Sequence, residues 1–394
     1  MIPTPHLYSA LWSYLAQWSI HKDLRHLKAL AWMVVGLVYS QKLNLTAWEP
    51  YVQSPAQYAQ SYQRRWRRFL ANPRITVSDW YVPLVMQAIG SWKQSPVSLA
   101  LDTTMLWNEY CMIHLSVVCC GRAVPLLWKT IKHKSASVAF EEYRLLLDQA
   151  HWLLCEFTDV TLLADRAFAC HDLLDWLEKS RWHWCLRLAR DTQVHGPLGK
   201  GRSCPISYLA PKLGEAKLYH NIGLWEDGLH RCNLVLAYPH GIDKDDFWAI
   251  ITDLPPSLEV PRRYGERFCC EELFLDSKSG AFQLEQSRLR DAQAITRLYL
   301  VVAVALLFCT QQGLAVQVAG LRRQVDPHWD RGISFLKIGI NWVKGALHKG
   351  RTLFPPLPLP ITDPEPCFAS HKAKERSYRN LLFDSFSVFL CPSN

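Results

Sequence analysis

The stretch Val97–Ile131, VSLALDTTMLWNEYCMIHLSVVCCGRAVPLLWKTI, decides the fold because it holds three apolar runs in close succession. Val97–Asp102 predicts a buried strand, Tyr110–Val118 a second strand and Ala123–Ile131 a third, which follows the break at Gly121. Three such runs without an intervening helix predict that a sheet begins here.

Alternating elements follow this stretch. The sequence predicts, in order, a helix, a strand, a helix and a strand, over Ser137–Cys155, Val160–Asp165, His171–Ser180 and Trp184–Leu188. Three strands followed by this alternation is the order of a ribonuclease-H-like mixed sheet, an inference by analogy of fold. We therefore expect a mixed α/β catalytic domain.

The remaining segments divide around this core. Glycines and strand-like runs at Leu218–Trp225, Cys232–Tyr238 and Phe247–Thr252 predict a β-rich insertion. The predicted organisation is a helical DNA-binding domain at 1–95, a first catalytic part at 96–189, the insertion at 190–259, a helical second catalytic part at 260–350, and a proline-rich linker and tail at 351–394. We expect the tail after residue 367 to be poorly ordered. The apolar run Leu298–Cys309 is too short to span a bilayer, so we expect a buried helix and no membrane partner.

Composition narrows the class of protein. The chain has 394 residues, 49% of them hydrophobic, which predicts a folded protein with a large core. Its 13 cysteines show no Cys-x-x-Cys spacing, and the first twenty residues lack the features of a signal peptide. We therefore expect reduced cysteines in a cytoplasmic protein, and neither a zinc site nor a disulfide framework.

Positive charge is concentrated near the N-terminus. Residues 1–96 hold ten Lys or Arg and three Asp or Glu, so seven of the nine net positive charges lie there. Within Ser61–Leu70, four arginines surround two aromatic residues that share a helix face: Arg64, Arg65, Arg67 and Arg68 around Trp66 and Phe69. A solvated basic face is one interpretation. The one we favour is a helix laid against DNA phosphates.

Two aspartates end apolar strands. Asp102 follows SLAL and Asp165 follows TLLA. A carboxylate beside an apolar strand is costly unless a group pairs with it, and Mg²⁺ prefers oxygen ligands. A metal site is therefore one interpretation of each residue, and an aspartate that caps a turn is the other.

A third acidic residue lies on a predicted helix. Tyr264, Arg267, Glu271 and Lys278 are at offsets 0, 3, 7 and 14, which at roughly 100° per residue places them within about a 60° arc. A surface ladder of ion pairs would give the same stripe. A carboxylate that binds metal, flanked by cations that hold a DNA strand, is the alternative.

The spacing Tyr-x2-Arg-x3-Glu-x6-Lys resembles the signature of bacterial transposases of the insertion-sequence-four family, which includes the transposon-five enzyme. Leu101–Thr104 and Ala164–Phe168 resemble the two aspartate segments of that family, and Arg64–Pro73 resembles its arginine-rich N-terminal segment. The position of the β-rich insertion also fits. The resemblance covers roughly residues 20–345.

The resemblance implies a ribonuclease-H-like DDE enzyme that uses two Mg²⁺ or Mn²⁺ ions held by Asp102, Asp165 and Glu271, about 3.5–4 Å apart. It further implies that Tyr264, Arg267 and Lys278 grip DNA phosphates. By the same resemblance Trp248 stacks on a base flipped out during hairpin formation, whereas a core position in a strand is the competing interpretation.

The expected activity is cut-and-paste transposition of an element bounded by terminal inverted repeats. Its partners would be the double-stranded DNA of transposon ends and target, and a second copy of the chain in a synaptic homodimer. A ribonuclease-H-like nuclease without strand transfer and a domesticated DNA-binding protein are the alternatives.

Overall fold

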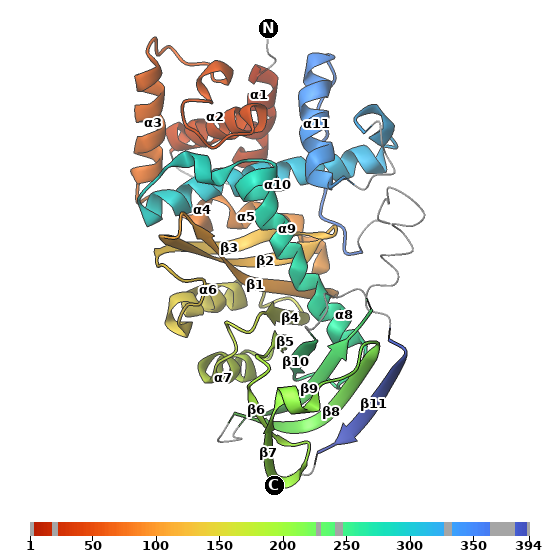
Figure 1. The fold of residues 1–394 in the computed structure, drawn as a ribbon. Helices are drawn as coiled ribbons and strands as arrows, with labels where there is room; N and C mark the ends of the chain where they lie inside the picture. The colour runs from red at the N-terminus through yellow and green to blue at the C-terminus, as the bar shows by residue number, and fades with distance from the viewer. Residues whose placement is uncertain are drawn as a thin grey trace. The chain divides into compact units, whose positions relative to one another are not determined.

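The computed structural model describes residues 4–17, 23–225, 230–240, 247–326, 333–362 and 383–391 (Figure 1). The chain forms two compact units, and each is built from several segments. Unit 1 comprises 1–93, 103–136 and 269–367, and unit 2 comprises 94–102, 137–268 and 368–394. Strand β1 (Pro96–Leu106) contributes residues to both.

Unit 2 is built on a mixed sheet. Its strands after β1 are β4 (Asp159–Ala164), β5 (His183–Arg187), β6 (Gln193–Gly196), β7 (Gly199–Pro205), β8 (Glu215–Leu224), β9 (Arg231–Tyr238), β10 (Trp248–Thr252) and β11 (Ser385–Leu390). The strand order is β1-β4-β5-β10-β9-β8-β6-β7, and β11 pairs with β8. The pairs β1–β4, β4–β5 and β8–β11 are parallel, and the others are antiparallel. The prediction of a mixed α/β protein is confirmed.

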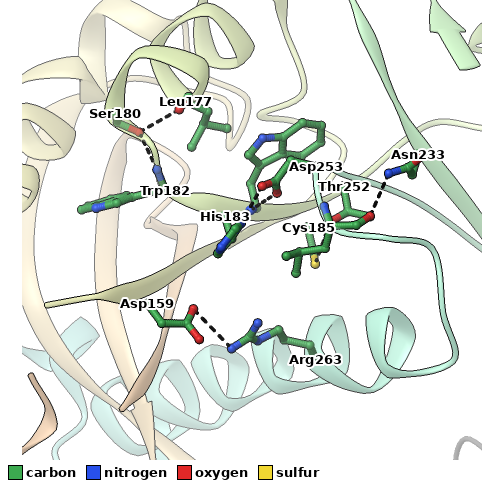
Figure 2. Close-up of polar contacts among 12 residues, drawn as sticks. Asp159, Leu177, Ser180, Trp182, His183, Cys185, Asn233, Thr252, Asp253 and Arg263 are labelled. Atoms are coloured by element: carbon green, nitrogen blue, oxygen red, sulfur yellow. Dashed lines mark hydrogen bonds and ion pairs between the residues drawn. The ribbon is translucent and has the colours of Figure 1, made fainter. Parts of the chain in front are cut away.

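The strands of the predicted insertion extend this sheet. β10 pairs with β5 on one side and with β9 on the other, so the last strand of the insertion lies inside the sheet. At the start of β5, the imidazole Nδ1 of His183 lies 2.6 Å from Oδ2 of Asp253. The other carboxylate oxygen of Asp253, Oδ1, accepts the backbone N–H of Trp184 at 2.9 Å. These contacts fasten the end of β10 to the start of β5 (Figure 2).

Three helices belong to unit 2: α6 (Phe140–Leu153), α7 (His171–Ser180) and α8 (Glu259–Gly265). Helix α8 packs on β10, β5 and β9. Its buried residues Val260 and Tyr264 join an apolar cluster with Leu163, Cys185, Leu218, Val235, Ala237, Trp248 and Ile250. This cluster, termed the α8 core below, joins the inner strands of the sheet to the helix that leads to the predicted catalytic glutamate.

Unit 1 is mostly helical. Its helices are α1 (Thr4–Ala16), α2 (Leu24–Ser40), α3 (Ala59–Ala71), α4 (Val77–Trp80), α5 (Val82–Ala88), α9 (Cys269–Leu275), α10 (Ala292–Val318) and α11 (Phe335–His348). Its strands β2 (Tyr110–Cys119) and β3 (Arg122–Lys132) form an antiparallel hairpin. Helix α10 contacts β3, where the Trp128 indole N–H donates to the backbone oxygen of Thr296 at 2.9 Å.

Helix α10 is the centre of unit 1. By length and composition it could cross a membrane, because its most apolar 18-residue stretch has a mean hydropathy of 1.9. However, 78% of that stretch is buried inside the protein, which is typical of a core helix. It crosses α11 at close range: a Cβ at Gly313 would overlap the backbone carbonyl of Phe335, and one at Gly339 would overlap that of Cys309. Only glycine permits this approach at the two positions. The predicted buried helix at Leu298–Cys309 is confirmed as the central part of α10.

The tail differs from the prediction at one end. Residues 385–390 form β11, so the expectation of a poorly ordered tail after residue 367 is wrong for this part. Residues 363–382 lie outside the described residues. Strand β11 forms along the edge of β8, which supplies its hydrogen-bonding partners.

Candidate active site

Asp102 and Asp165 lie on neighbouring parallel strands of unit 2. Leu101 in β1 is the register partner of Ala164 in β4, so the two aspartates, each one residue further along, lie at adjacent points of the sheet. Asp102 is 8% exposed and still within β1, whereas Asp165 is half-buried and directly follows β4. The parallel register therefore brings together two of the three predicted acids.

The charge of Asp102 is balanced by a cation from its own unit. Arg267 Nη1 donates to Asp102 Oδ2 at 2.6 Å, and the arginine is 5% exposed. The guanidinium also lies over the ring of Phe268, 4.7 Å from its centroid. A carboxylate this deeply buried requires a compensating positive charge, and Arg267 supplies it here. The sequence predicted a DNA-binding role for Arg267 and gave no sign of this ion pair.

Asp165 forms a turn. Its Oδ1 accepts the backbone N–H of Ala167 at 2.9 Å, and its backbone oxygen accepts the N–H of Phe168 at 3.1 Å. This is the turn-capping geometry that the sequence offered as an alternative. One carboxylate oxygen in the turn leaves the other available as a ligand, so the two interpretations are compatible.

Arg187 is a further residue of this edge. Leu186 in β5 is the register partner of Ala164, which places Arg187 next to Asp165 at the end of the neighbouring strand. Charges at Arg267, Arg187 and Asp165 all act on the hydroxyl of Tyr264, whose pKa is raised above 10 mainly by burial. Sequence analysis missed Arg187. The sequence feature that could have revealed it is a cation directly after the apolar residues of β5.

The predicted helix face at 264–278 is not continuous, which corrects the expectation of one regular helix. A 3₁₀ turn at Glu266–Phe268 separates α8 from α9, and a π turn at Asp276–Gly280 follows α9. The rotation per residue therefore changes along the segment, and 100° steps do not hold. Tyr264 is fully buried and Arg267 almost so, whereas Glu271 is exposed and Lys278 partly exposed.

Glu271 and Lys278 belong to unit 1. Glu271 lies in the first turn of α9. The Lys278 ammonium donates to the backbone oxygen of Met105 at 2.7 Å and to Thr104 Oγ1 at 3.3 Å, and it lies 3.7 Å from a Glu285 carboxylate oxygen. Lys278 is therefore tied to the end of β1.

Trp248 occupies a core position. It is 7% exposed, stacks on Phe268 with ring centroids 5.5 Å apart, and meets Tyr264 edge-on at the same distance. Both aromatic partners flank Arg267, so the α8 core forms the apolar wall behind the Asp102–Arg267 pair. A base could stack on Trp248 only after the indole has left this cluster.

The N-terminal arginines lie on α3 as predicted. Trp66 and Phe69 are buried, whereas Arg64, Arg67 and Arg68 are exposed. Arg65 is half-buried with its guanidinium 5.1 Å from the centroid of the Trp66 ring. The helix thus buries its aromatic side and presents cations outward.

The donor set suits a hard divalent cation. Asp102 and Asp165 offer carboxylate oxygens at adjacent points, and the need of Asp102 for a positive charge is evident from its pair with Arg267. Among the residues that the structure describes, no group of three or more His, Cys, Asp or Glu side chains is gathered closely enough to hold a metal ion.

Comparison with known protein families identifies the class of protein. A family model described as transposase DDE domain matches residues 108–308, just over half of the chain. The chain belongs to this family. It is therefore a DNA transposase, an enzyme of DNA cleavage and strand transfer, and proteins with this domain generally use divalent metal ions. The matched range contains Asp165 and Glu271 and begins six residues after Asp102.

Other comparisons add less. The transposase is similar to a chain in a cryo-EM structure of the piggyBac transposase synaptic complex with hairpin DNA, at 9% sequence identity and a TM-score of 0.43. That similarity covers 97% of this chain and 85% of the other. No curated protein sequence matches the transposase.

Proposed function

We propose that the transposase cuts and joins DNA at the terminal inverted repeats of an insertion sequence of the insertion-sequence-four family, with Asp102, Asp165 and Glu271 as its acidic triad. One observation carries the proposal: a chain of the DDE family places Asp102 and Asp165 at adjacent points of parallel strands. Glu271 is the acidic residue of the signature Tyr264, Arg267, Glu271 and Lys278.

Two Mg²⁺ or Mn²⁺ ions are the proposed cofactors. The triad would hold them, and when bound they would activate the attacking oxygen and stabilise the leaving oxygen of a phosphodiester. The adjacent positions of Asp102 and Asp165 support this, because carboxylate oxygens are the ligands that Mg²⁺ and Mn²⁺ prefer. Arg267 pairs with Asp102 in the structure, and Arg187 lies beside Asp165.

The N-terminal helices are the proposed binding site for the inverted repeats. Between α2 and α3 a hollow of about 620 Å³ is lined largely by basic and polar side chains: Arg25, His26, Lys28, Gln53, Arg65, Arg68 and Asn72. Arg25 is partly neutralised by Asp23, 2.9 Å away. Arg64 and Arg67 are further exposed cations on α3. Clustered cations of this kind favour a phosphate backbone through the release of counterions.

Hairpin formation and synapsis complete the proposal. The resemblance supports a flipped base stacked on Trp248, which would require the indole to leave the α8 core. A homodimer would hold two transposon ends together, and a bacterial cytoplasmic location would give access to the nucleoid.

The test of this function is a reaction with Mg²⁺, a DNA that carries the terminal inverted repeats, and a target plasmid. Joined products are expected, and nicked DNA without joining would instead support a nuclease. For end binding, we expect the combined variant Arg64→Ala, Arg67→Ala and Arg68→Ala to lower the slope of log K against log salt by up to about 3. The matched control Lys349→Ala removes an exposed cation outside α3 and should leave the slope unchanged.

A further inference from the structure

Three cations line a hollow at the C-terminal end of α11. The hollow has a volume of about 300 Å³, and all of its lining residues belong to unit 1. Trp342 forms part of its wall, and its polar lining consists of Gln324, Asn341, Lys344, Lys349 and Arg351. All of these except Lys344 and Trp342 are exposed, so the hollow opens to solvent. Its volume lies at the lower end of the range for small-molecule sites, about 300–1,000 Å³, which suits a small ligand.

These three cations have no carboxylate partner within ion-pair distance among the described residues. Lys344 Nζ donates to Gln41 Oε1 at 2.8 Å, and Arg351 Nη1 donates to Gln324 Oε1, so both partners are neutral amides. The lining contains no Asp or Glu, and the sequence from 333 to 362 holds four Lys or Arg and no acidic residue. Positive charge that is gathered around a hollow without a counter-charge attracts an anion.

The helix end accounts for only part of this charge. Cations near a helix C-terminus are stabilised by the helix dipole, which would explain Lys349 and Arg351. Lys344 precedes the last turn of α11 and is half-buried, and this burial lowers its pKa from 10.5. A charged ammonium group there costs free energy that a nearby anion would reduce. Trp342 is 3% exposed, and its indole N–H is a further donor without a hydrogen-bond partner among the described residues.

We propose that this hollow binds a phosphate group. Its two ammonium groups, its guanidinium and its side-chain amides supply the positive charge and the N–H donors that phosphate oxygens accept. In a DNA transposase the backbone of duplex DNA is one source of the phosphate, and a free phosphate anion offers the same chemistry. The hollow shares no residue with the one between α2 and α3, so DNA bound here would be a segment other than the terminal repeats. The inference rests on the proposed function only for this last point.

The first test uses inorganic phosphate as the probe on the full chain, without DNA or metal. We expect saturable binding in titration calorimetry, and a rise in melting temperature that chloride at equal ionic strength does not produce. The double variant Lys349→Ala and Arg351→Ala should bind phosphate with at least a tenfold higher Kd. The matched control, Lys212→Ala with Lys337→Ala, removes two exposed cations outside the hollow and should bind like the wild type. Thermal melts check that both variants are folded.

The second test uses duplex DNA without the terminal repeats, in EDTA so that no DNA is cut. If the DNA backbone is the source, the double variant should lower the slope of log K against log salt by up to about 2, and the matched control should not. Loss of this slope assigns the site to DNA, and loss of phosphate affinity alone assigns it to a free anion. If the double variant changed neither the phosphate affinity nor the slope, the proposal would be overturned, whether or not the acidic triad cuts DNA.

Discussion

The ion pair between Arg267 and Asp102 allows metal binding at Asp102 to be tested through the stability of the folded protein. Both groups are nearly buried, at 5% and 8% exposure, and their N–O distance is 2.6 Å. Replacement of Arg267 by alanine leaves the Asp102 carboxylate without this cation. Loss of one partner of a buried pair costs about 3–5 kcal/mol, because the remaining charge stays desolvated.

A divalent cation should offset part of that cost. If Asp102 ligates metal, binding to the folded state at a hundred times Kd adds about 2.7 kcal/mol of stability. We therefore expect Arg267→Ala to melt far below the wild type in EDTA, and to gain more from Mg²⁺ or Mn²⁺ than the wild type does. In the wild type, Arg267 already neutralises the carboxylate. The assay is thermal unfolding of both proteins with EDTA and over a metal titration.

The matched control is Arg263→Ala, one turn earlier in the same segment. Arg263 pairs with Asp159 at 3.8 Å, and both side chains are partly exposed (Figure 2). Pairs of this kind contribute about 0–1 kcal/mol, so this variant should melt near the wild type with or without metal. If Arg267→Ala behaved like Arg263→Ala in EDTA, or if metal did not stabilise it further, the assignment of Asp102 as a metal ligand beside Arg267 would be refuted.

Two further predictions concern buried aromatic residues. His114 is fully buried between Phe274 and Tyr299, neither ring nitrogen has a hydrogen-bond partner among the described residues, and burial lowers its pKa from 6.5 to about 3. Between pH 6.5 and pH 3 the imidazole of His114 is protonated in the unfolded chain but not in the folded protein. The free energy of unfolding therefore decreases as the pH falls, by about 2 kcal/mol from pH 6.5 to pH 5. Denaturant unfolding of His114→Phe should lack this loss, and an unchanged pH dependence would contradict the argument. Trp248→Ala should cost about 3–5 kcal/mol of unfolding free energy, because the indole fills the α8 core. A cost below 1 kcal/mol would show that the indole is not packed as described.

Much of the fold could be predicted because many of its helices and strands follow from patterns within short stretches of sequence. The runs that became β1 to β5 were recognised from apolar composition and turn residues, and α7 was predicted with its observed ends. β11 could not be predicted, since six uncharged residues at the end of a chain form a strand only where a partner edge exists.

The adjacency of two candidate acids follows from features visible in the sequence, but their environment does not. Asp102 and Asp165 stood out as acids at the ends of apolar strands, and the parallel register brings them together. The pair between Asp102 and Arg267 joins residues 165 positions apart, and such a contact leaves no local pattern. The 3₁₀ and π turns around α9 likewise escaped the prediction, because spacing assumes a constant rotation per residue.

The most direct test of the acidic triad uses isosteric variants of Asp102, Asp165 and Glu271 in a DNA cleavage assay. Asp102→Asn, Asp165→Asn and Glu271→Gln keep the side-chain shape but remove the negative charge that a divalent cation requires. With Mg²⁺ and DNA that carries the terminal repeats, each variant should show no detectable cleavage and near wild-type binding to the ends. Wild-type cleavage by any one of the three would contradict the triad.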